Sequence, residues 1–379
     1  MKVLFAGGGT AGHINPALAI AGYLREKQPN AEILFIGNRG GMEEKLVPKA
    51  GFNMKTIVIS GFQRKMTPKA VVHNVKTVVR VLTSSHQAKA IIKAFQPDLC
   101  VGTGGYVSGP VIRTAMKMGI PAIIHEQNAY PGVTNKMLSG GAARVMLAVS
   151  DAQKHLNPNA RCVLTGNPIR PDILRQDRES ARRQLGVDGR PLILSFGGSL
   201  GARKVNEAVA DLLTHTIPTG QFQHIHGYGQ YSRWMPDLLR EKGIDPDKTP
   251  QLDLREYIHD MPVCLAAADL VISRAGAMTL SEIQATGKAS ILIPSPNVAE
   301  NHQYHNAMAL VNRGAAEIVE EKDLTGDVLW EKVQKIFAQP GGAAQLGEKA
   351  AAMAIRNANE RIYDVMMDVL AEKKAGKKA

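Results

Sequence analysis

The segment SRAGAMTLSE runs from Ser273 to Glu282 and follows a short apolar stretch, DLVI, at positions 269–272. The apolar residues predict a buried strand of a parallel sheet, and the small residues that follow predict a turn into a helix. We expect Thr279 or Ser281 to cap this helix and Glu282 to lie in its first turn. A strand, a small-residue turn and a helix in this order predict one repeat of a doubly wound α/β domain.

The start of this predicted helix is a candidate binding site for an anion. The first backbone N–H groups of a helix have no partner inside it, and the helix dipole adds partial positive charge there. Phosphate on these amides, with ribose hydroxyls donating to the Glu282 carboxylate, would describe a nucleotide pocket. An ordinary capped helix with a solvated Glu282 is the alternative that these residues leave open.

Composition points to an anionic partner other than nucleic acid. The 379 residues carry a formal net charge of +12 and have a pI near 9.5, which favours nucleotides, phosphates or acidic lipid as partners. Aromatic residues make up only 5% and no RNA-binding signature occurs, so a stacking platform for nucleic acid is not expected. The three cysteines are scattered in apolar runs, which predicts reduced, buried thiols in a cytosolic protein.

Positions 45–97 contain basic residues but no Asp or Glu. Valines recur there at helical spacing, as in an amphipathic helix packed on a sheet. The alternative is a basic surface on anionic lipid, worth about 1 kcal/mol per nearby basic residue. The apolar start of the chain is too short for a signal peptide, and no run reaches the ~20 apolar residues that span a bilayer. The candidate membrane patch consists of Lys65, Lys69, Lys76 and Arg80.

A glycine-rich turn, Gly7–His13 (GGGTAGH), follows the first predicted strand at 3–6. We expect Asn15 to cap a helix that starts at Pro16. The spacing differs from the dinucleotide G-x-G-x-x-G pattern and no acid ends the second strand, which counts against a nicotinamide dehydrogenase. His13, at the mouth of the turn, is a candidate general base, and a loop histidine bonded to the backbone is the alternative.

Two further strands are predicted to end in glycine-rich or polar turns. One leads into GTGGYVSG at 102–109 and the other into HEQN at 125–128. Polar groups directly after a buried strand are expensive to hold unless they bond one another or a ligand. A mutually bonded cluster fits His125 and Glu126, whereas Asn128 lies further out and is the better candidate for a ligand contact.

The opening of the chain is repeated about half-way along it. Glycine and proline at 166–170 (GNPIR) interrupt the pattern, and a strand at 191–196 then enters Gly197–Arg203 (GGSLGAR). Ser199 and the neighbouring amides form a second candidate phosphate cradle. The repeat predicts two doubly wound parallel-sheet domains facing one cleft. We place the domains at 1–165 and 166–345, with a C-terminal helix in 346–379 packing back on the first domain.

No metal site is expected. Asp245 and Asp247 have the D-x-D spacing of metal-dependent sugar transferases, but they lie in a Gly/Pro-rich turn without an adjoining strand. His302 and His305 have a spacing found in metal ligands, yet no carboxylate or thiol completes a set.

Together these motifs resemble the family of MurG-type transferases, which add N-acetylglucosamine to lipid I in peptidoglycan synthesis. Ala11 stands where the family usually has a third turn glycine, and Leu200 stands where glutamine is common. We expect a small effect on local geometry and none on the assignment. The matching segments occur in the family's order between residue 7 and about residue 310: GGGTAGHINPALAIA, TGGYVSGP, HEQNAYPGVTNK, GNPIR, FGGSLGARKVNEAV, SRAGAMTLSE and AENHQYHNA.

The resemblance implies a GT-B fold with a lipid-acceptor and membrane-contacting N-terminal domain and a C-terminal domain that holds UDP-N-acetylglucosamine. The Ile258 backbone would read uracil, Arg170 would lie near the nucleotide and Glu282 would take the ribose hydroxyls. Ser199 and the turn at 277–280 would hold the diphosphate. The other donor-side candidates are Thr10, Ala11, Gly12, Asn206, Ala277, Met278, Thr279, Leu280 and Ser281, with Asn128 and Gln303 on the sugar. Those on the acceptor side are Gly104, Gly105 and Tyr106.

The implied reaction is one inverting displacement that needs neither a metal nor a cofactor. The C4 hydroxyl of the acceptor's N-acetylmuramic acid attacks the anomeric carbon, with His13 as the expected base and Glu126 as the less favoured one. The implied partners are UDP-N-acetylglucosamine, undecaprenyl-linked lipid I, an anionic membrane surface and other cell-wall synthesis and division proteins. The implied location is peripheral, on the cytoplasmic face of the bacterial cell membrane.

Two other functions stay open at this point. One is a different UDP-sugar enzyme of the same fold, such as a UDP-N-acetylglucosamine epimerase or a diacylglycerol glycosyltransferase. The other is a nucleotide-sugar-binding module without turnover. A product assay with lipid I separates all three.

Overall fold

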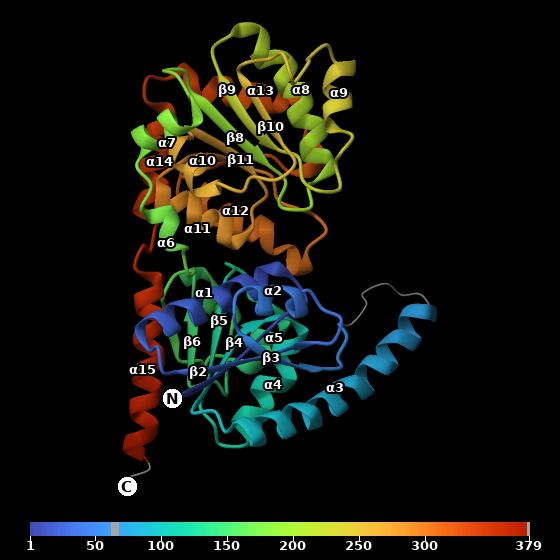
Figure 1. The fold of residues 1–379 in the computed structure, drawn as a ribbon, viewed down its shortest axis with the longest axis vertical. Coiled ribbons are helices and arrows are strands. Elements are labelled where there is room, and N and C mark those ends of the chain that lie inside the picture. Colours follow the sequence, from blue (N-terminus) through green and yellow to red (C-terminus); the bar gives the residue numbers. More distant parts are fainter. Residues whose placement is uncertain (62–67, 377–379) are drawn as a thin grey trace. The chain divides into compact units, whose positions relative to one another are not determined.

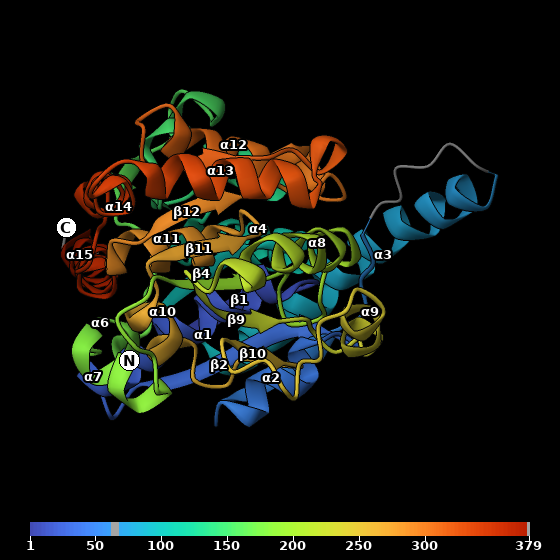
Figure 2. The same cartoon turned by 90° about the horizontal axis from the view of Figure 1, so that it is seen from above.

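A computed structural model describes residues 1–61 and 68–376 of the chain. The chain divides into two compact units, one formed by Met1–Pro168 with Asn357–Ala379 and the other by Ile169–Arg356. Each unit is an α/β domain built on one parallel sheet (Figure 1). Helices flank the strands of each sheet on both faces (Figures 1 and 2), which explains why the strands are continuous apolar runs in the sequence.

The first unit has a seven-stranded sheet with the order β3-β2-β1-β4-β5-β6-β7. The order reverses between β1 and β4, and doubly wound domains bind ligands at the carboxyl ends of the strands beside such a switch point. The strands are β1 (Lys2–Gly7), β2 (Glu32–Asn38), β3 (Asn53–Ile57), β4 (Leu99–Gly104), β5 (Ala122–Glu126), β6 (Arg144–Leu147) and β7 (Cys162–Leu164). The helices are α1 (Ala11–Lys27), α2 (Glu43–Lys49), α3 (Pro68–Phe95), α4 (Gly105–Lys117), α5 (Val133–Leu138), η1 (Ser150–His155) and α15 (Ala358–Gly376).

Alternate residues of β1 enter two different cores of this unit. Val3 and Phe5 pack with α1, α2 and α15 on one face of the sheet. Leu4 and Ala6 pack with α3, α4 and α5 on the other face. All four side chains are fully buried, so β1 is fixed on both sides and holds the turn that follows it.

Helix α15 brings the end of the chain back onto the first unit. Met366 and Val369 are buried in the same core as α1. The Gln28 Nε2 amide donates a hydrogen bond to the Tyr363 hydroxyl at 2.7 Å. The last helix is therefore part of the hydrophobic core of the first unit.

The second unit has a six-stranded parallel sheet with the order β10-β9-β8-β11-β12-β13 and a switch point between β8 and β11. Its strands are β8 (Leu192–Phe196), β9 (Gln223–Gly227), β10 (Leu252–Arg255), β11 (Leu270–Ser273), β12 (Ala289–Leu292) and β13 (Glu317–Ile318). Its helices are α6 (Pro171–Leu174), α7 (Arg178–Leu185), α8 (Arg203–Thr219), α9 (Met235–Glu241), α10 (Met261–Ala267), α11 (Ala277–Thr286), η2 (Ala299–Asn301), α12 (His302–Val311), η3 (Glu321–Asp323), α13 (Gly326–Ala338) and α14 (Gly342–Ala352).

Helix α1 starts earlier than the sequence predicted. It begins at Ala11 with Thr10 as its N-cap residue, so Asn15 does not cap it and Pro16 lies inside the helix. The backbone bond that Pro16 lacks would go to the carbonyl of Gly12. Gly12 is exposed, so water can solvate that carbonyl and the proline does not interrupt the helix.

Helix α11 also starts earlier than predicted. Gly276 is its N-cap residue and makes no side-chain capping bond. Neither Thr279 nor Ser281 caps the helix, and the Ser281 hydroxyl instead donates to the Ala277 carbonyl at 3.1 Å. Glu282 consequently lies in the second turn, because the small residues after β11 let the chain enter the helix at once.

Candidate functional site

At the switch point of the first unit, the glycine-rich turn after β1 lies against the start of α4, which begins at Gly105 directly after β4 ends at Gly104. A Cβ atom added to Gly105, whose φ is +78°, would lie 2.1 Å from the Gly8 carbonyl oxygen. One added to Gly9, whose φ is +86°, would lie 2.6 Å from the Tyr106 ring. Glycine is required at positions 9 and 105 because φ is positive there. It is also required because the segment 8–9 and the start of α4 approach each other too closely for a Cβ atom.

His13 lies in the first turn of α1 and faces the end of β4. Its Nδ1 is 3.0 Å from the Thr103 carbonyl oxygen, and the Thr103 hydroxyl donates to the His13 carbonyl at 2.7 Å. A carbonyl oxygen can only accept, so Nδ1 carries the hydrogen and Nε2 of the neutral ring keeps a lone pair. The backbone bond therefore orients the ring and leaves the other nitrogen chemically able to take a proton.

Glycine at positions 104 and 105 makes room for this ring. A Cβ atom on Gly104, whose φ is +97°, would lie 2.8 Å from His13 Nδ1, and one on Gly105 would lie 3.2 Å from its Cδ2. Two acceptor-side candidates thus contact the candidate base directly. Tyr106, the third, has its pKa raised by burial first and by the charge of Glu43 second.

Glu126 is a buried carboxylate at the end of β5 with four hydrogen-bond donors. Its Oε1 accepts from the backbone and side-chain nitrogens of Asn128, at 2.9 and 3.0 Å. Its Oε2 accepts from the Gly132 N–H at 3.1 Å and the Asn135 side chain at 2.8 Å. These bonds fix the turn after β5 and occupy both oxygens of the carboxylate. The geometry therefore favours a structural role for Glu126 over that of a general base. The side-chain amide of Asn128 is held in the same cluster.

His125 is fully buried and neutral. Its Nε2 donates to the Gly166 carbonyl at 2.9 Å, and Gln127 donates to its Nδ1 at 3.0 Å. Burial lowers the pKa of this imidazole below its ordinary value. The polar run after β5 is therefore a mutually bonded cluster, which was one of the two interpretations that the sequence allowed.

In the second unit, a hydrogen bond from the neighbouring helix α12 holds the turn between β11 and α11. Asn306 of α12 donates from its side chain to the Ala275 carbonyl at 3.2 Å. The N-terminus of α11 has no side-chain cap, and the Leu280 N–H is bonded to the Gly276 carbonyl at 3.0 Å. The Leu280 N–H is thus used inside the helix, and Leu280 contributes a buried side chain.

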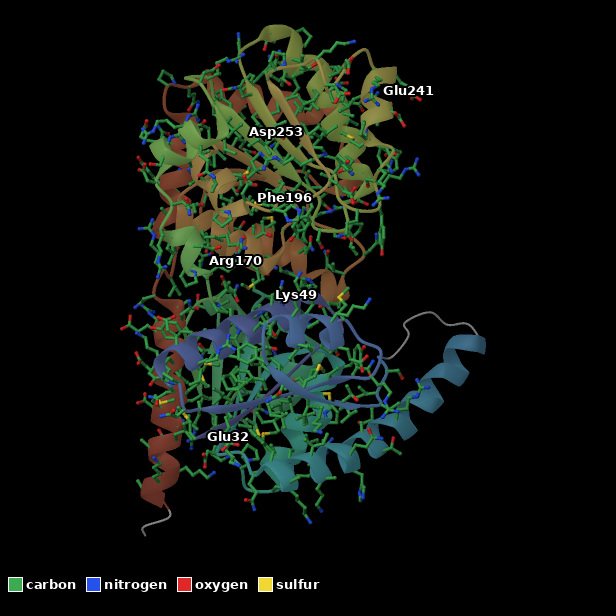
Figure 3. The ribbon with its side chains drawn as sticks, in the orientation of Figure 1. Glu32, Lys49, Arg170, Phe196, Glu241 and Asp253 are labelled. Atoms are coloured by element: carbon green, nitrogen blue, oxygen red, sulfur yellow. The ribbon has the colours of Figure 1, made fainter. Side chains whose placement is uncertain are left out.

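Glu282 is paired with Arg170 in the second unit. Arg170 Nε lies 3.4 Å from Glu282 Oε1, and the glutamate side chain is only 14% exposed. Burial raises the pKa of this carboxyl, and Arg170 opposes that shift. Arg170, labelled in Figure 3, is the N-cap residue of α6. The structure therefore brings together two residues that the resemblance placed at the nucleotide.

The turn after β8 packs on the turn after β9. A Cβ atom on Gly229, whose φ is +82°, would lie 2.1 Å from the Gly201 nitrogen. Ser199 is exposed on the outer side of this turn, and its carbonyl accepts from the Gln230 N–H at 3.3 Å. Asn206 is fully buried and donates to the Tyr228 carbonyl at 2.8 Å. Asn206 therefore holds the turn after β9.

Ile258 and Gln303 lie on two other turns of the second unit. Ile258 follows β10, and its buried side chain packs so closely on Gly227 that a Cβ there would lie 2.9 Å from Ile258 Cδ1. Gln303, in the first turn of α12, accepts from the Ser295 N–H at 2.9 Å. Glu300 and Asn301, just before α12, have φ of 54° and 49°. Non-glycine residues with positive φ are strained, and two of them follow each other here. Such strained residues are concentrated in functional loops.

The structure describes only part of the predicted membrane patch. Lys65 lies outside the described residues, and the side chains of Lys69 and Lys76 do as well, although their backbone belongs to α3. Further along α3, Ala88 and Ile92 are buried in the core of the first unit. This later part of α3 therefore packs on the sheet, whereas the side chains of the valines at 71–79, on which the helix-on-sheet interpretation rested, lie outside the described residues. Arg80 is partly exposed. Within residues 1–61 and 68–376, no helix is long and apolar enough to cross a membrane.

Several polar residues of the site were not identified from the sequence. Glu43 is 1% exposed and lies beneath the first glycine-rich turn. Asn135 and Asn306 are also buried and hold turns after β5 and β11. A lone Glu or Asn in a helical pattern gives no signal of this kind, because only the fold brings it beneath a distant turn. In the described part of the chain, no three His, Cys, Asp or Glu residues are grouped so as to hold a metal.

The sequence matches two family models, one in each half of the chain. Residues 3–147 match the glycosyltransferase family 28 N-terminal domain, and residues 192–362 match the family 28 C-terminal domain. A relative from Acetivibrio thermocellus is 44% identical over 379 residues, covering 99% of this chain and 100% of the relative. That relative is named UDP-N-acetylglucosamine–N-acetylmuramyl-(pentapeptide) pyrophosphoryl-undecaprenol N-acetylglucosamine transferase.

Solved structures share the fold over almost the whole chain. The crystal structure of Acinetobacter baumannii MurG has a TM-score of 0.76 at 28% identity and covers 97% of this chain and 99% of its own. A UDP-N-acetylglucosamine 2-epimerase from Neisseria meningitidis has a TM-score of 0.66 at 12% identity, covering 97% and 100%. The second likeness concerns the fold alone. The predicted GT-B class, with two Rossmann-like parallel-sheet domains, is confirmed.

Proposed function

Because the chain belongs to glycosyltransferase family 28 and resembles the MurG-type transferases over its full length, we propose that it transfers N-acetylglucosamine from UDP-N-acetylglucosamine to lipid I. The product is lipid II for peptidoglycan synthesis. The full-length similarity to a transferase of that name carries this conclusion. The start of α11, which has no side-chain cap, and the partly buried Glu282 beside Arg170 are the features of the second unit that fit a nucleotide-sugar donor.

The second unit binds the donor in this proposal, and the first unit receives the acceptor. The amides of residues 277–279 and the turn at Ser199 hold the diphosphate. Glu282 accepts from the ribose hydroxyls, and Arg170 opposes the rise in the pKa of this carboxyl that burial causes. Ile258 borders the uracil, and Gln303 lies on the side of the sugar.

The first unit supplies the base. The acceptor's C4 oxygen forms a bond to the anomeric carbon, the bond from that carbon to the UDP oxygen breaks, and the electron pair leaves with UDP. The hydroxyl proton goes to Nε2 of His13, whose Nδ1–H is held by the Thr103 carbonyl. One displacement of this kind converts an α-linked donor into a β-linked product. The committed carboxylate of Glu126 fits this task less well.

Fixed N–H donors take the place of a cation in this scheme. The charge that develops on UDP meets the positive end of the α11 dipole and the backbone amides of the Ser199 turn, which need no reorganisation during the reaction. Turnover should therefore persist in EDTA. Loss of turnover in EDTA that manganese restores would contradict this part of the proposal.

The acceptor's lipid tail requires a membrane surface, and α3 is our candidate for the contact. The acid-free stretch that includes α3 carries Lys65, Lys69, Lys76 and Arg80, which suit the anionic cytoplasmic leaflet of a bacterial cell. Reversing the charge of the three lysines together should weaken sedimentation with anionic vesicles. Binding that survives both this change and high salt would remove the patch from the proposal.

The deciding experiment incubates the purified chain with UDP-N-acetylglucosamine and a lipid I analogue and identifies the products. The expected products are UDP and a β-linked disaccharide lipid. An epimerase of the same fold would instead release N-acetylmannosamine products without any acceptor. A binding module would release no UDP with any acceptor.

A further inference from the structure

Glu43 is a buried carboxylate of the first unit that the proposed reaction does not use. It is the first residue of α2 and is 1% exposed. Within the described part of the chain no Lys, Arg or His forms an ion pair with it. A carboxylate is costly to bury unless hydrogen bonds or charges compensate it, so the contacts that hold Glu43 identify what it stabilises.

Those contacts are made with two turns at the carboxyl edge of the sheet. Oε1 accepts from the Asn38 N–H at 2.8 Å, and Oε2 lies 3.5 Å from the Gly9 N–H. The start of α2 adds a favourable dipole. Glu43 therefore links the turn after β2 to the glycine-rich turn after β1.

Three glycines leave the space that this carboxyl side chain fills. A Cβ on Gly8 would lie 2.3 Å from Oε1, one on Gly37 2.4 Å from Cγ, and one on Gly41 2.6 Å from Oε2. At all three positions φ lies outside the left-handed region, so the backbone conformation alone would permit alanine. Close approach to Glu43 accounts for glycine at each of them.

A second path runs from Glu43 to Tyr106. Asn38, whose N–H bonds Glu43, donates from its side chain to the Tyr106 hydroxyl at 3.5 Å. The Tyr106 ring covers Gly9. Glu43, Asn38, Gly9 and Tyr106 thus form one closed set of contacts beneath the residues that lead into α1 and His13.

We propose that Glu43 is a positioning residue for the acceptor side of the site: its carboxylate fixes the Gly8–Gly9 turn and the Tyr106 ring in the geometry that the acceptor requires. The inference rests on the proposed transfer to lipid I for its kinetic readout. Glu43 itself touches no reacting atom in this proposal and acts through the turn and the ring.

The test compares Glu43→Gln with Glu44→Gln in the full-length enzyme. Both variants make the same chemical change at neighbouring positions, but Glu44 is exposed. A glutamine at position 43 places an NH2 group opposite one of the two N–H donors, so one hydrogen bond is lost and the turn is no longer fixed. The kcat/KM for lipid I should therefore fall about 10-fold or more in Glu43→Gln. The KM for UDP-N-acetylglucosamine should stay within about two-fold, because the residues proposed to hold its uracil, ribose and diphosphate lie in the other unit. Glu44→Gln should match the wild type.

Gly41→Ala is a second variant that leaves Glu43 chemically intact. Its methyl group would meet the carboxylate at 2.6 Å and displace it, so the same selective loss of kcat/KM for lipid I is expected. Equal kinetics of Glu43→Gln and Glu44→Gln would overturn the proposal. So would a Glu43→Gln enzyme whose lower activity reflects only a smaller folded fraction, with both KM values unchanged.

One readout does not depend on turnover. The charge of Glu43 contributes to the raised pKa of the Tyr106 phenol, so Glu43→Gln should shift its ultraviolet titration to lower pH and Glu44→Gln should not. Tyr106→Phe identifies the signal among the eight tyrosines. If the wild type does not convert lipid I, the proposed function fails, whereas an unshifted phenol titration contradicts the positioning role by itself.

Discussion

At Glu282, burial and a neighbouring cation act on one carboxylate in opposite directions. Burial raises its pKa, and Arg170 at 3.4 Å lowers it again. A bound ribose would give the carboxylate two further donors. We therefore predict that Glu282→Ala raises the KM for UDP-N-acetylglucosamine at least about 10-fold through the loss of charge-assisted hydrogen bonds.

Initial rates over a range of donor concentrations measure this effect, with lipid I held saturating. The exposed Glu179→Ala serves as the matched control, because it removes the same group from a helix of the same unit. A donor KM in Glu282→Ala that equals that of Glu179→Ala would rule out a ribose contact.

A second prediction at the scale of single residues concerns His13 as the base. Its ring is oriented by a backbone carbonyl rather than by an acid, so removal of the ring should cost the proton transfer without disturbing donor binding. We predict that His13→Ala lowers kcat about 10²- to 10⁴-fold, while the affinity for UDP by calorimetry stays unchanged. A variant that keeps its kcat would exclude His13 as the base.

At the scale of one element, β9 carries two buried histidines, His224 and His226. Burial lowers the pKa of His224 to about 3 and that of His226 to about 4. In the unfolded chain both titrate near 6.5. Between these values the unfolded state binds protons that the folded state does not, so stability is full above pH 6.5 and falls as the pH decreases.

We predict that the free energy of unfolding of the second unit drops by on the order of 2 kcal/mol per histidine between pH 7 and pH 5. Urea unfolding at several pH values measures this slope. His224→Gln and His226→Gln should each flatten it, even where they lower stability at pH 7. The exposed His259→Gln should keep the wild-type slope, and an equal slope in all variants would contradict the prediction.

At the scale of the whole molecule, one chain forms two units, and the end of the chain belongs to the first. Met366 of α15 is fully buried with Phe5 of β1 and Leu24 of α1. We predict that Met366→Ala destabilises the first unit by about 2–5 kcal/mol and leaves the second unit unchanged. UDP should stabilise the second unit, since a ligand stabilises the folded state that binds it.

Calorimetry with and without UDP separates the two transitions. Met367→Ala is a suitable comparison, because Met367 is only partly buried at the edge of the same core. A Met366→Ala variant in which the UDP-sensitive transition moves would show that α15 stabilises the second unit instead.

Much of the fold and part of the site could be predicted from sequence. The strands and the glycine-rich turns that follow β1 and β8 are local in origin, because an apolar run followed by glycines specifies a buried strand and a close backbone approach in any parallel sheet. The turn predicted at 102–109 was wrong, because β4 runs to Gly104 and α4 begins at Gly105. Helix starts were less predictable. The turns before α1 and α11 contain several residues able to cap, and packing selected Thr10 and Gly276.

The sequence by itself determined that two doubly wound domains carry glycine-rich turns at their switch points, since hydrophobic runs and glycines act over a few neighbouring residues. Only the tertiary structure decided which polar side chains are bonded to other groups of the protein. Glu126 is surrounded by four donors, one nitrogen of His13 is bonded to Thr103, and Glu43 lies under a turn 34 residues away. Hydrogen bonds depend on atoms that meet in space, and residues so far apart along the chain meet only once the sheet has formed.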